Sequence, residues 1–233
     1  MKKMKTLFAV CFFCGIVSVH AQLPTLSKKE VKDGWVLLFD GKTFNGWKKS
    51  NAQPFTGKGW NIENGVLSVN PADGRGGDIV TTKEFGDFDF SLDFKLEKGT
   101  NSGVKYSVFK NSNLGCEYQI IDDANHPDAK LGKNGNRSLA ALYDVLPVSG
   151  QKVVKPLGEW NNIRILSKGT HVEHWLNGKK VLEYERGSEQ LKNAVAESKF
   201  KNDKGWGETT PSPILLQEHG DAIHFRNIKI KPL

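Results

Sequence analysis

Residues 88–97 read Phe-Asp-Phe-Ser-Leu-Asp-Phe-Lys-Leu-Glu, and this stretch decides the fold. Apolar and polar side chains alternate along it without a break. A period of two places successive side chains on opposite faces of an extended chain, so that one face is buried and the other meets solvent. The stretch therefore predicts a long strand in a sheet with one wet face, which is typical of antiparallel sheets.

The same alternation returns in shorter runs, whose apolar members are Val104, Tyr106, Val108, Ile163 and Ile165. Two further runs, at residues 172–176 and 180–184, flank Asn177-Gly178. This dipeptide predicts a tight hairpin because both turn positions require a positive φ, which Asn and Gly tolerate.

The last run changes register in its middle. Ile223 and Phe225 follow one phase of the alternation, whereas Ile228 and Ile230 follow the other. A β-bulge near Arg226-Asn227 would return both pairs to the core face, so we expect one there.

Short antiparallel strands at regular spacing predict an all-β fold of the sandwich or jelly-roll type, with a single domain over residues 22–233. One short helix is expected near residues 188–198, where Leu191, Ala194 and Val195 form an apolar stripe. Residues 123–138 and 201–212 are rich in polar and glycine residues and are expected to be long loops, which often bind ligands.

Residues 1–21 have the pattern of a secretory signal peptide. Lys2, Lys3 and Lys5 precede an uncharged and mostly apolar run over residues 6–19, and Ala21 ends a stretch suited to cleavage. No cysteine lies at that point, which disfavours a lipoprotein. We therefore expect export to the periplasm or beyond, with no membrane span in the mature chain.

Charge and cysteine content disfavour nucleic-acid binding and a disulfide within the chain. Removal of the three signal lysines reduces the formal net charge from +7 to +4, and the remaining lysines are scattered, so the pattern does not indicate nucleic-acid binding. Cys116 would be the one cysteine left, so no disulfide within the chain is expected.

Residues 117–122, Glu-Tyr-Gln-Ile-Ile-Asp, carry the best candidates for chemistry. On a strand, Glu117 and Gln119 share one face. A bulge at residues 120–121 would bring Asp122 beside them, and two carboxyl groups so placed could act as acid and base or bind a divalent metal. Alternatively, both acids are ordinary solvent-facing strand residues.

A second candidate segment is Leu-Leu-Gln-Glu-His-Gly at residues 215–220, where a strand ends in a loop. His219 can transfer protons near neutral pH or bind a metal, or it can simply cap the turn. Asn101 lies in a turn between strands, and turn geometry alone explains it. Tyr143 could stack on a sugar ring or be a half-buried strand-end residue.

Several chemical motifs are missing from the chain. It has no glycine-rich loop before a helix, no Gly-x-Ser-x-Gly, no Cys-x-x-Cys and no His-Glu-x-x-His. Nucleotide binding, serine-hydrolase chemistry and structural zinc are therefore disfavoured.

Ten short segments in one order resemble the 3-keto-disaccharide hydrolase domain family over roughly residues 34–233. Each segment alone is weak evidence for the family, but the ordered set is specific to it. They lie at residues 35–47, 81–90, 101–103, 117–122, 141–144, 155–161, 176–178, 198–200, 216–220 and 225–228.

The resemblance implies a concanavalin A-like sandwich of two antiparallel sheets and glycoside substrates already oxidised at carbon 3, supplied by an upstream 3-dehydrogenase. Elimination of the aglycone followed by hydration would give net hydrolysis. The roles implied are base and acid for Glu117, Asp122 and His219, and electrophile for Arg226 or a metal held by those three. Substrate contacts are implied for Gln119, Tyr143, Gln217 and Asn101.

Two alternatives remain open from the residues. The Glu-x-Gln-x-x-Asp pattern is similar to the Glu-x-Asp-x-x-Glu strand of laminarinase-like retaining glycosidases, with Gln119 in place of the middle carboxylate. Retaining enzymes hold two carboxyl groups about 5 Å apart, and the changed residues weaken this interpretation. A non-catalytic sugar-binding module is the other alternative, since sandwich folds host both.

Overall fold

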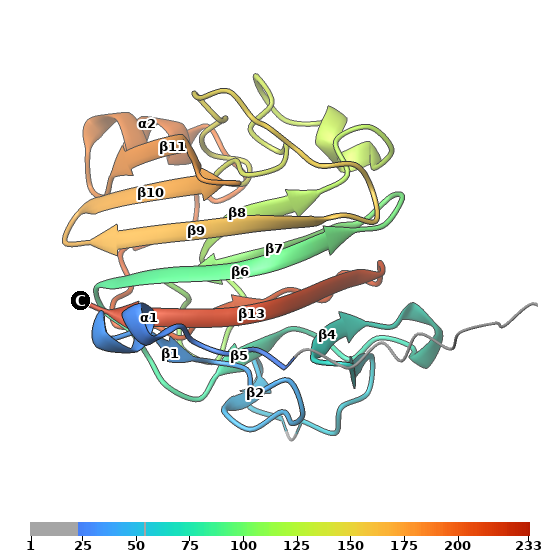
Figure 1. The fold of residues 1–233 in the computed structure, drawn as a ribbon. Helices are drawn as coiled ribbons and strands as arrows, with labels where there is room; N and C mark the ends of the chain where they lie inside the picture. The colour runs from blue at the N-terminus through green and yellow to red at the C-terminus, as the bar shows by residue number, and fades with distance from the viewer. Residues whose placement is uncertain (1–22, 54) are drawn as a thin grey trace, which may run out of the picture.

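The computed structural model describes residues 23–53 and 55–233, which form two antiparallel sheets packed face to face. Figure 1 shows β9, β6 and β13 of the larger sheet in front of β7 and β8 of the smaller one. The predicted two-sheet sandwich is confirmed. The expected signal peptide lies outside the described residues.

The larger sheet has eight strands, in the spatial order β11 (Lys179–Glu185), β10 (His171–Leu176), β9 (Trp160–Lys168), β6 (Phe88–Leu96), β13 (Ile223–Pro232), β4 (Val66–Val69) and β3 (Trp60–Glu63), with β1 (Val36–Leu37) paired to β13. The smaller sheet has five strands, in the order β2 (Trp47–Lys49), β5 (Ile79–Thr81), β12 (Leu215–Leu216), β7 (Asn101–Tyr106) and β8 (Cys116–Ile121).

The core lies between the sheets and is filled by the apolar face of each strand. On β6, every apolar residue of the predicted alternation is at most 3 % exposed, from Phe88 to Leu96. From the smaller sheet, Cys116, Tyr118 and Ile120 of β8 point into the same core. Cys116 is a free thiol, and burial raises its pKa to about 12.

The bulge predicted in the last strand and the predicted Asn-Gly hairpin are both present. The pairing of β13 with β6 shifts register between Arg226 and Lys229, and Asn227 has a φ of 53°. Because of this bulge, Phe225 and Ile228 are both buried. In the β10–β11 hairpin, Asn177 and Gly178 have φ values of 47° and 76°, as the Asn-Gly turn requires.

The expected helix is present as α2 (Glu189–Ala196), with Ser188 as its N-cap. A second helix, α1 (Lys28–Lys32), was not predicted. It begins with a capping box in which Ser27 and Glu30 satisfy each other's backbone N–H groups. Short 3-10 turns occur at Pro71–Asp73 and Pro127–Lys130. None of the described helices has the length and apolarity needed to cross a bilayer.

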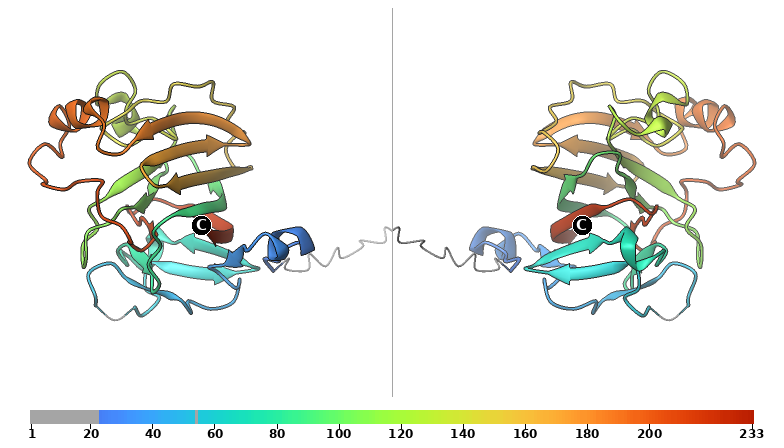
Figure 2. Two further views of the ribbon diagram at one scale, coloured as in Figure 1. Left: turned by 90° about the vertical axis from the view of Figure 1, so that its left-hand side faces the viewer. Right: turned by 90° about the vertical axis from the view of Figure 1, so that its right-hand side faces the viewer.

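The two long loops expected from the sequence follow β8 and α2. In Figure 2 the loop after β8 and α2 lie at the top of both side views, and the loop after α2 descends from there along the side of the molecule. The smaller sheet is therefore flanked by loops beside β7 and β8, which is where a pocket can form.

Candidate active site

The floor of the candidate site is the outer face of β7 and β8. Since Tyr118 and Ile120 point into the core, the alternate residues Glu117 and Gln119 point outward, as predicted. Pairing places Glu117 opposite Lys105 and Gln119 opposite Gly103. Two charged groups of opposite sign thus meet on a polar sheet face.

A pocket of about 240 Å³ opens over this floor. Loops from four other parts of the chain complete its wall. The lining comprises Asn101, Lys105, Asn113, Leu114, Gly115, Glu117, Gln119, Tyr143, Lys199, Phe200, Gln217 and His219.

Glu117 is the central carboxylate of the pocket and is only 4 % exposed. Its Oε2 lies 3.4 Å from Lys105 Nζ. The carboxylate lies so close against Gly103 that a Cβ at that position would come within 2.5 Å of Glu117 Oε1. Burial raises the pKa of Glu117 more than the charges of Lys105 and Lys199 lower it, so the group is a stronger base than an exposed glutamate.

The segment carrying His219 follows β12 and is held by the backbone and side chain of residues 77–78, which precede β5. The Glu218 N–H donates to Asp78 Oδ1 at 2.9 Å, and Glu218 Oε2 accepts from the Gly77 N–H at 2.9 Å. With Glu218 fixed in this way, Gln217 and His219 both line the pocket. His219 is exposed at its rim, and the structure brings it to the same pocket as Glu117, as predicted.

Two buried acceptors in this pocket have no partner. Gln119 Oε1 and Gln217 Oε1 make no hydrogen bond within the described chain, although Gln119 is only 1 % exposed. The Gln119 amide nitrogen makes one long bond of 3.4 Å to Asn101 Oδ1. Buried acceptors without partners are costly, so this floor suits a ligand that brings several hydroxyl donors.

Tyr143 forms a wall of the pocket, because its segment is hydrogen-bonded along β8. The Tyr143 N–H donates to Glu117 O at 3.0 Å, and the Ala140 N–H donates to Gln119 O at 2.8 Å. Burial and a hydrogen bond with Asp128 raise the pKa of Tyr143 well above its ordinary value. Tyr143 therefore stays neutral, and the Arg137 guanidinium lies 5.4 Å from the centroid of its ring. Stacking of the ring on a sugar stays a prediction.

Lys199 adds a second positive charge. Its Nζ lies 4.1 Å from the centroid of the Tyr143 ring and 5.0 Å from that of Phe200. Sequence reasoning assigned no role to Lys105 or Lys199. Lys105 occupies a polar position of an alternating strand, where the sequence does not distinguish it from a surface lysine. A signal for Lys199 did exist, because residues 198–200 form one of the segments that carry the family resemblance.

A buried polar network behind the site was also missed. His174 is fully buried, and burial lowers its pKa to about 4, so it is neutral. It contacts Ala140 O at 2.9 Å through Nδ1 and the Tyr106 hydroxyl at 2.6 Å through Nε2, and Tyr106 in turn contacts Tyr184 at 2.9 Å. The network fixes Ala140, whose φ of 70° is unusual for alanine, directly beside β8.

The expected position of Asp122 is wrong. The pairing of β7 with β8 runs through Ile121 without a register shift, so no bulge turns Asp122 toward Glu117. Its carboxylate instead accepts bonds from the Gly99 N–H at 2.9 Å and the Asn125 amide at 2.6 Å. Burial tends to raise the pKa of Asp122, but these bonds outweigh it and lower the pKa. Asp122 shapes a turn.

The expected position of Arg226 is also wrong. It lies on the outer face of the eight-stranded sheet, where its Nε is 3.3 Å from Asp93 Oδ2 and its guanidinium lies 4.1 Å from the centroid of the Trp160 ring. The bulge does aim Arg226 and Asn227, but toward Asp93. The sandwich separates this face from the pocket.

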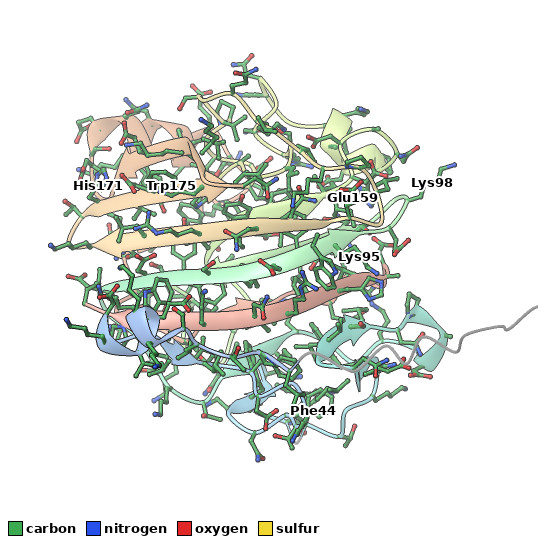
Figure 3. All side chains as sticks on the ribbon, in the orientation of Figure 1. Phe44, Lys95, Lys98, Glu159, His171 and Trp175 are labelled. Carbon is green, nitrogen blue, oxygen red and sulfur yellow. The ribbon has the colours of Figure 1, made fainter. Side chains whose placement is uncertain are left out.

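The predicted metal set of Glu117, Asp122 and His219 is not assembled, because Asp122 is bound elsewhere. In residues 23–53 and 55–233, the three His or acidic side chains that do converge are His171, Glu173 and Glu183 on β10 and β11. Figure 3 labels His171 on the outer face of the eight-stranded sheet. Lys180 already forms ion pairs with Glu173 and Glu183 there.

Comparison with known proteins gives consistent results. The model of the 3-keto-alpha-glucoside-1,2-lyase-like domain family matches residues 34–231. A protein of Bacteroides thetaiotaomicron named 3-keto-disaccharide hydrolase is 38 % identical over 91 % of this chain and 83 % of its own length.

Two crystal structures from Parabacteroides distasonis, both described as a "putative glycosyl hydrolase", have similar folds. The first has a TM-score of 0.80 and 33 % identity, with 91 % of this chain and all of that chain covered. The second has a TM-score of 0.64 and 30 % identity, with 85 % and 99 % covered.

Proposed function

The chain belongs to the 3-keto-alpha-glucoside-1,2-lyase-like domain family, and from this premise we propose that its pocket cleaves glycosides oxidised at carbon 3. The observation that carries the proposal is the pocket itself. A buried carboxylate with a raised pKa, Glu117, shares it with His219 and with two lysines. Its relatives support the coarser statement that the chain is a carbohydrate hydrolase.

The ketone makes the chemistry possible with these side chains. A carbonyl at carbon 3 acidifies the hydrogen on carbon 2, and loss of that proton allows the aglycone to leave from carbon 1. Glu117 is the base, since its buried carboxylate faces into the pocket. His219, at the rim, gives a proton to the departing aglycone and then activates the water that adds across the double bond.

The enolate that forms on proton loss needs a positive environment. Lys105 and Lys199 supply it, in place of the arginine that the sequence suggested. The hydroxyl groups that remain on the sugar would donate to Gln119 Oε1 and Gln217 Oε1, beside Asn101. Tyr143 offers its ring face to the sugar.

A plain retaining glycosidase fits the pocket less well. That mechanism uses two carboxyl groups about 5 Å apart. Among the described residues that line the pocket, Glu117 is the one carboxylate, and Gln119 occupies the neighbouring outward position. The keto-sugar reaction needs one carboxylate base and is therefore favoured.

The test compares two substrates. We expect the protein to release aglycone from a 3-keto-glucoside and not from the same glucoside unoxidised, with each assay run with and without a chelator. Release from the unoxidised glucoside would instead support the plain glycosidase. Binding without release would support a sugar-binding module. Loss of release in the chelator arm would add a metal to the mechanism.

The proposed substrate and the N-terminal sequence together indicate where the protein works and what acts before it. Since the ketone must be made first, an enzyme that oxidises carbon 3 of glycosides acts upstream. The signal sequence at residues 1–21 would export the chain, so we propose that it works in the periplasm or outside the cell. Fractionation of cells with an antibody against the chain would test this.

A further inference from the structure

We propose that Lys199 bonds covalently to the substrate, as an imine with the ketone at carbon 3. This inference rests on the proposed function, and it changes the role of Lys199 from a charge that stabilises the enolate to a nucleophile. Lysine is the residue that enzymes use to form such imines with carbonyl substrates.

Position is the first support. Lys199 follows α2, and its backbone N–H donates to Asp144 Oδ2 at 2.8 Å, which ties it next to Tyr143. Its Nζ lies over the Tyr143 ring, and the residue lines the same pocket as Glu117. A ketone held on the polar floor would therefore lie between the amine and the carboxylate.

Availability of the amine is the second support, and here the two lysines differ. Lys105 is only 8 % exposed, and its Nζ donates to Asn113 O at 3.0 Å and pairs with Glu117. No described oxygen accepts a hydrogen bond from Lys199 Nζ, which faces aromatic rings instead. Lys105 is thus fixed as a structural charge, and Lys199 is the amine free to react.

The surroundings also favour a neutral amine. Partial burial of the amine beside the two rings lowers the pKa of Lys199, although the residue as a whole is exposed; the charge of Glu117 opposes this effect and the charge of Lys105 adds to it. A position next to another cationic group is one environment that activates amines for attack on carbonyl groups. Geometry and charge thus agree on the same side chain.

The imine would form in two steps. The Nζ lone pair attacks carbon 3, the carbonyl π electrons move to oxygen, and one proton passes from nitrogen to oxygen to give a neutral carbinolamine. The hydroxyl takes a second proton, from solvent, and the nitrogen lone pair then expels it as water, leaving a C=NH⁺ group; the solvent proton is returned when the iminium is hydrolysed. The iminium withdraws electrons more strongly than a ketone, so the hydrogen on carbon 2 becomes more acidic.

The remaining steps return the enzyme to its starting state. Glu117 takes the carbon-2 proton, and the electron pair forms an enamine. The enamine expels the aglycone from carbon 1 as an alcohol, with its proton from His219. Water then hydrolyses the iminium, which frees Lys199 and restores the ketone. A second water adds across the carbon 1–carbon 2 double bond, with His219 taking a proton from this water and Glu117 giving its proton back to carbon 2, so net consumption is one water for each glycoside cleaved.

Reductive trapping tests the bond directly. The protein would be incubated with cyanoborohydride and either a 3-keto-glucoside or a 3-keto sugar that carries hydrogen in place of the aglycone. Reduction of the iminium leaves a stable secondary amine. We expect intact-mass analysis to show one added sugar, and peptide mapping to place it on Lys199. Lys204, exposed in the following loop, provides the matched control Lys204→Arg.

Kinetics of Lys199→Arg complete the test, because arginine keeps the charge but cannot form the imine. We expect it to lose turnover about 100-fold and to lose the adduct, with its melting temperature retained. An adduct on Lys105, or no adduct together with turnover near wild type in Lys199→Arg, would overturn the proposal. If the wild-type protein releases no aglycone from the 3-keto-glucoside, the proposed function fails. Trapping with the 3-keto sugar that lacks an aglycone would still show whether Lys199 forms the imine.

Discussion

The outer faces of the two sheets arise from the same alternation of apolar and polar residues, yet they differ in how their polar groups are satisfied. On the eight-stranded sheet, Asp89 receives two bonds from Arg164, at 2.7 and 2.9 Å. On the five-stranded sheet, Gln119 and Gln217 keep buried acceptors without partners. Asn61 Oδ1 on β3 also lacks a partner, but among the described residues only the two glutamine acceptors line a pocket that holds a buried carboxylate, and we conclude that this combination marks the functional face.

The largest expected difference between the faces concerns turnover. Glu117→Gln should reduce kcat/KM for a 3-keto-glucoside on the order of 10³-fold, because it removes the base. Asp93→Asn, on the outer face of the eight-stranded sheet, should leave kcat/KM unchanged and weaken the contacts of this side chain to Arg226, Asn227 and Asn162. Steady-state kinetics with thermal melts would check both variants. Equal losses of turnover in Glu117→Gln and Asp93→Asn would show that the two faces do not differ in function.

The second largest effect on turnover is expected from Gly103, whose backbone lies against the Glu117 carboxylate. Gly103→Ala would place a Cβ within 2.5 Å of Glu117 Oε1 and force the carboxylate to move. Misplacement of a catalytic group by about 1 Å costs about 100-fold in rate, and we expect that loss in kcat. Gly86→Ala is the control, since its nearest contact would be Thr210 Oγ1 at 3.8 Å. A fully active Gly103→Ala would contradict the assignment of Glu117.

The two faces should respond oppositely to removal of an amide. Gln119→Met removes an acceptor that lacks a partner, so the free energy of unfolding should hold or rise, while KM rises about tenfold. Asn162→Leu removes bonds to Ser91, Leu92 and Asp93, at 3.2, 3.1 and 2.9 Å. It should cost about 2 kcal/mol of stability and leave KM unchanged.

Denaturant titrations and substrate saturation curves, on the same preparations, would measure these two effects. A destabilised Gln119→Met with normal KM would show that the pocket amide is structural after all.

The smallest effect is a difference in how stability depends on pH. Burial raises the pKa of Glu117 above its ordinary value of 4.5, so the folded state holds this proton more tightly and loses stability as pH rises above 4.5. At Glu173, burial acts upward, but bonds from Trp175, His171 and Lys180 outweigh it and lower the pKa. That carboxylate stabilises the fold above pH 4.5, and this contribution is lost as pH falls.

Melting curves from pH 3 to 8 would separate the two residues. The stability of Glu117→Gln relative to wild type should increase as pH rises, whereas the deficit of Glu173→Gln should shrink as pH falls. The same sign for both variants would refute the electrostatic contrast between the faces.

The sequence predicted the parts of the fold that depend on local pattern. The β13 bulge was predictable because Ile223 and Ile228 must both reach the core, and a hairpin at Asn177-Gly178 follows from φ alone. The bulge expected before Asp122 had no such hydrophobic demand behind it. Its polar pattern was equally compatible with a turn, and the turn formed.

Placement across the sandwich could not be predicted from the pattern. Alternation shows that Arg226 points outward but not from which sheet, because that depends on strand order over the whole chain. Glu117, Gln119, Gln217, Tyr143, Asn101 and His219 all line the pocket as expected. Lys199 was missed because its approach to Glu117 depends on how the loop after α2 packs on Tyr143.

The buried thiol of Cys116 can report on opening of the sheet that carries the pocket. Next to Glu117 along β8 but on the opposite side of the strand, it is fully shielded, and its high pKa keeps it protonated. If the chain is exported as proposed, it carries a cysteine that oxidants in that compartment cannot reach while the fold is closed. The rate at which a thiol reagent labels Cys116 would therefore record each transient opening of the sheet on which the pocket is built.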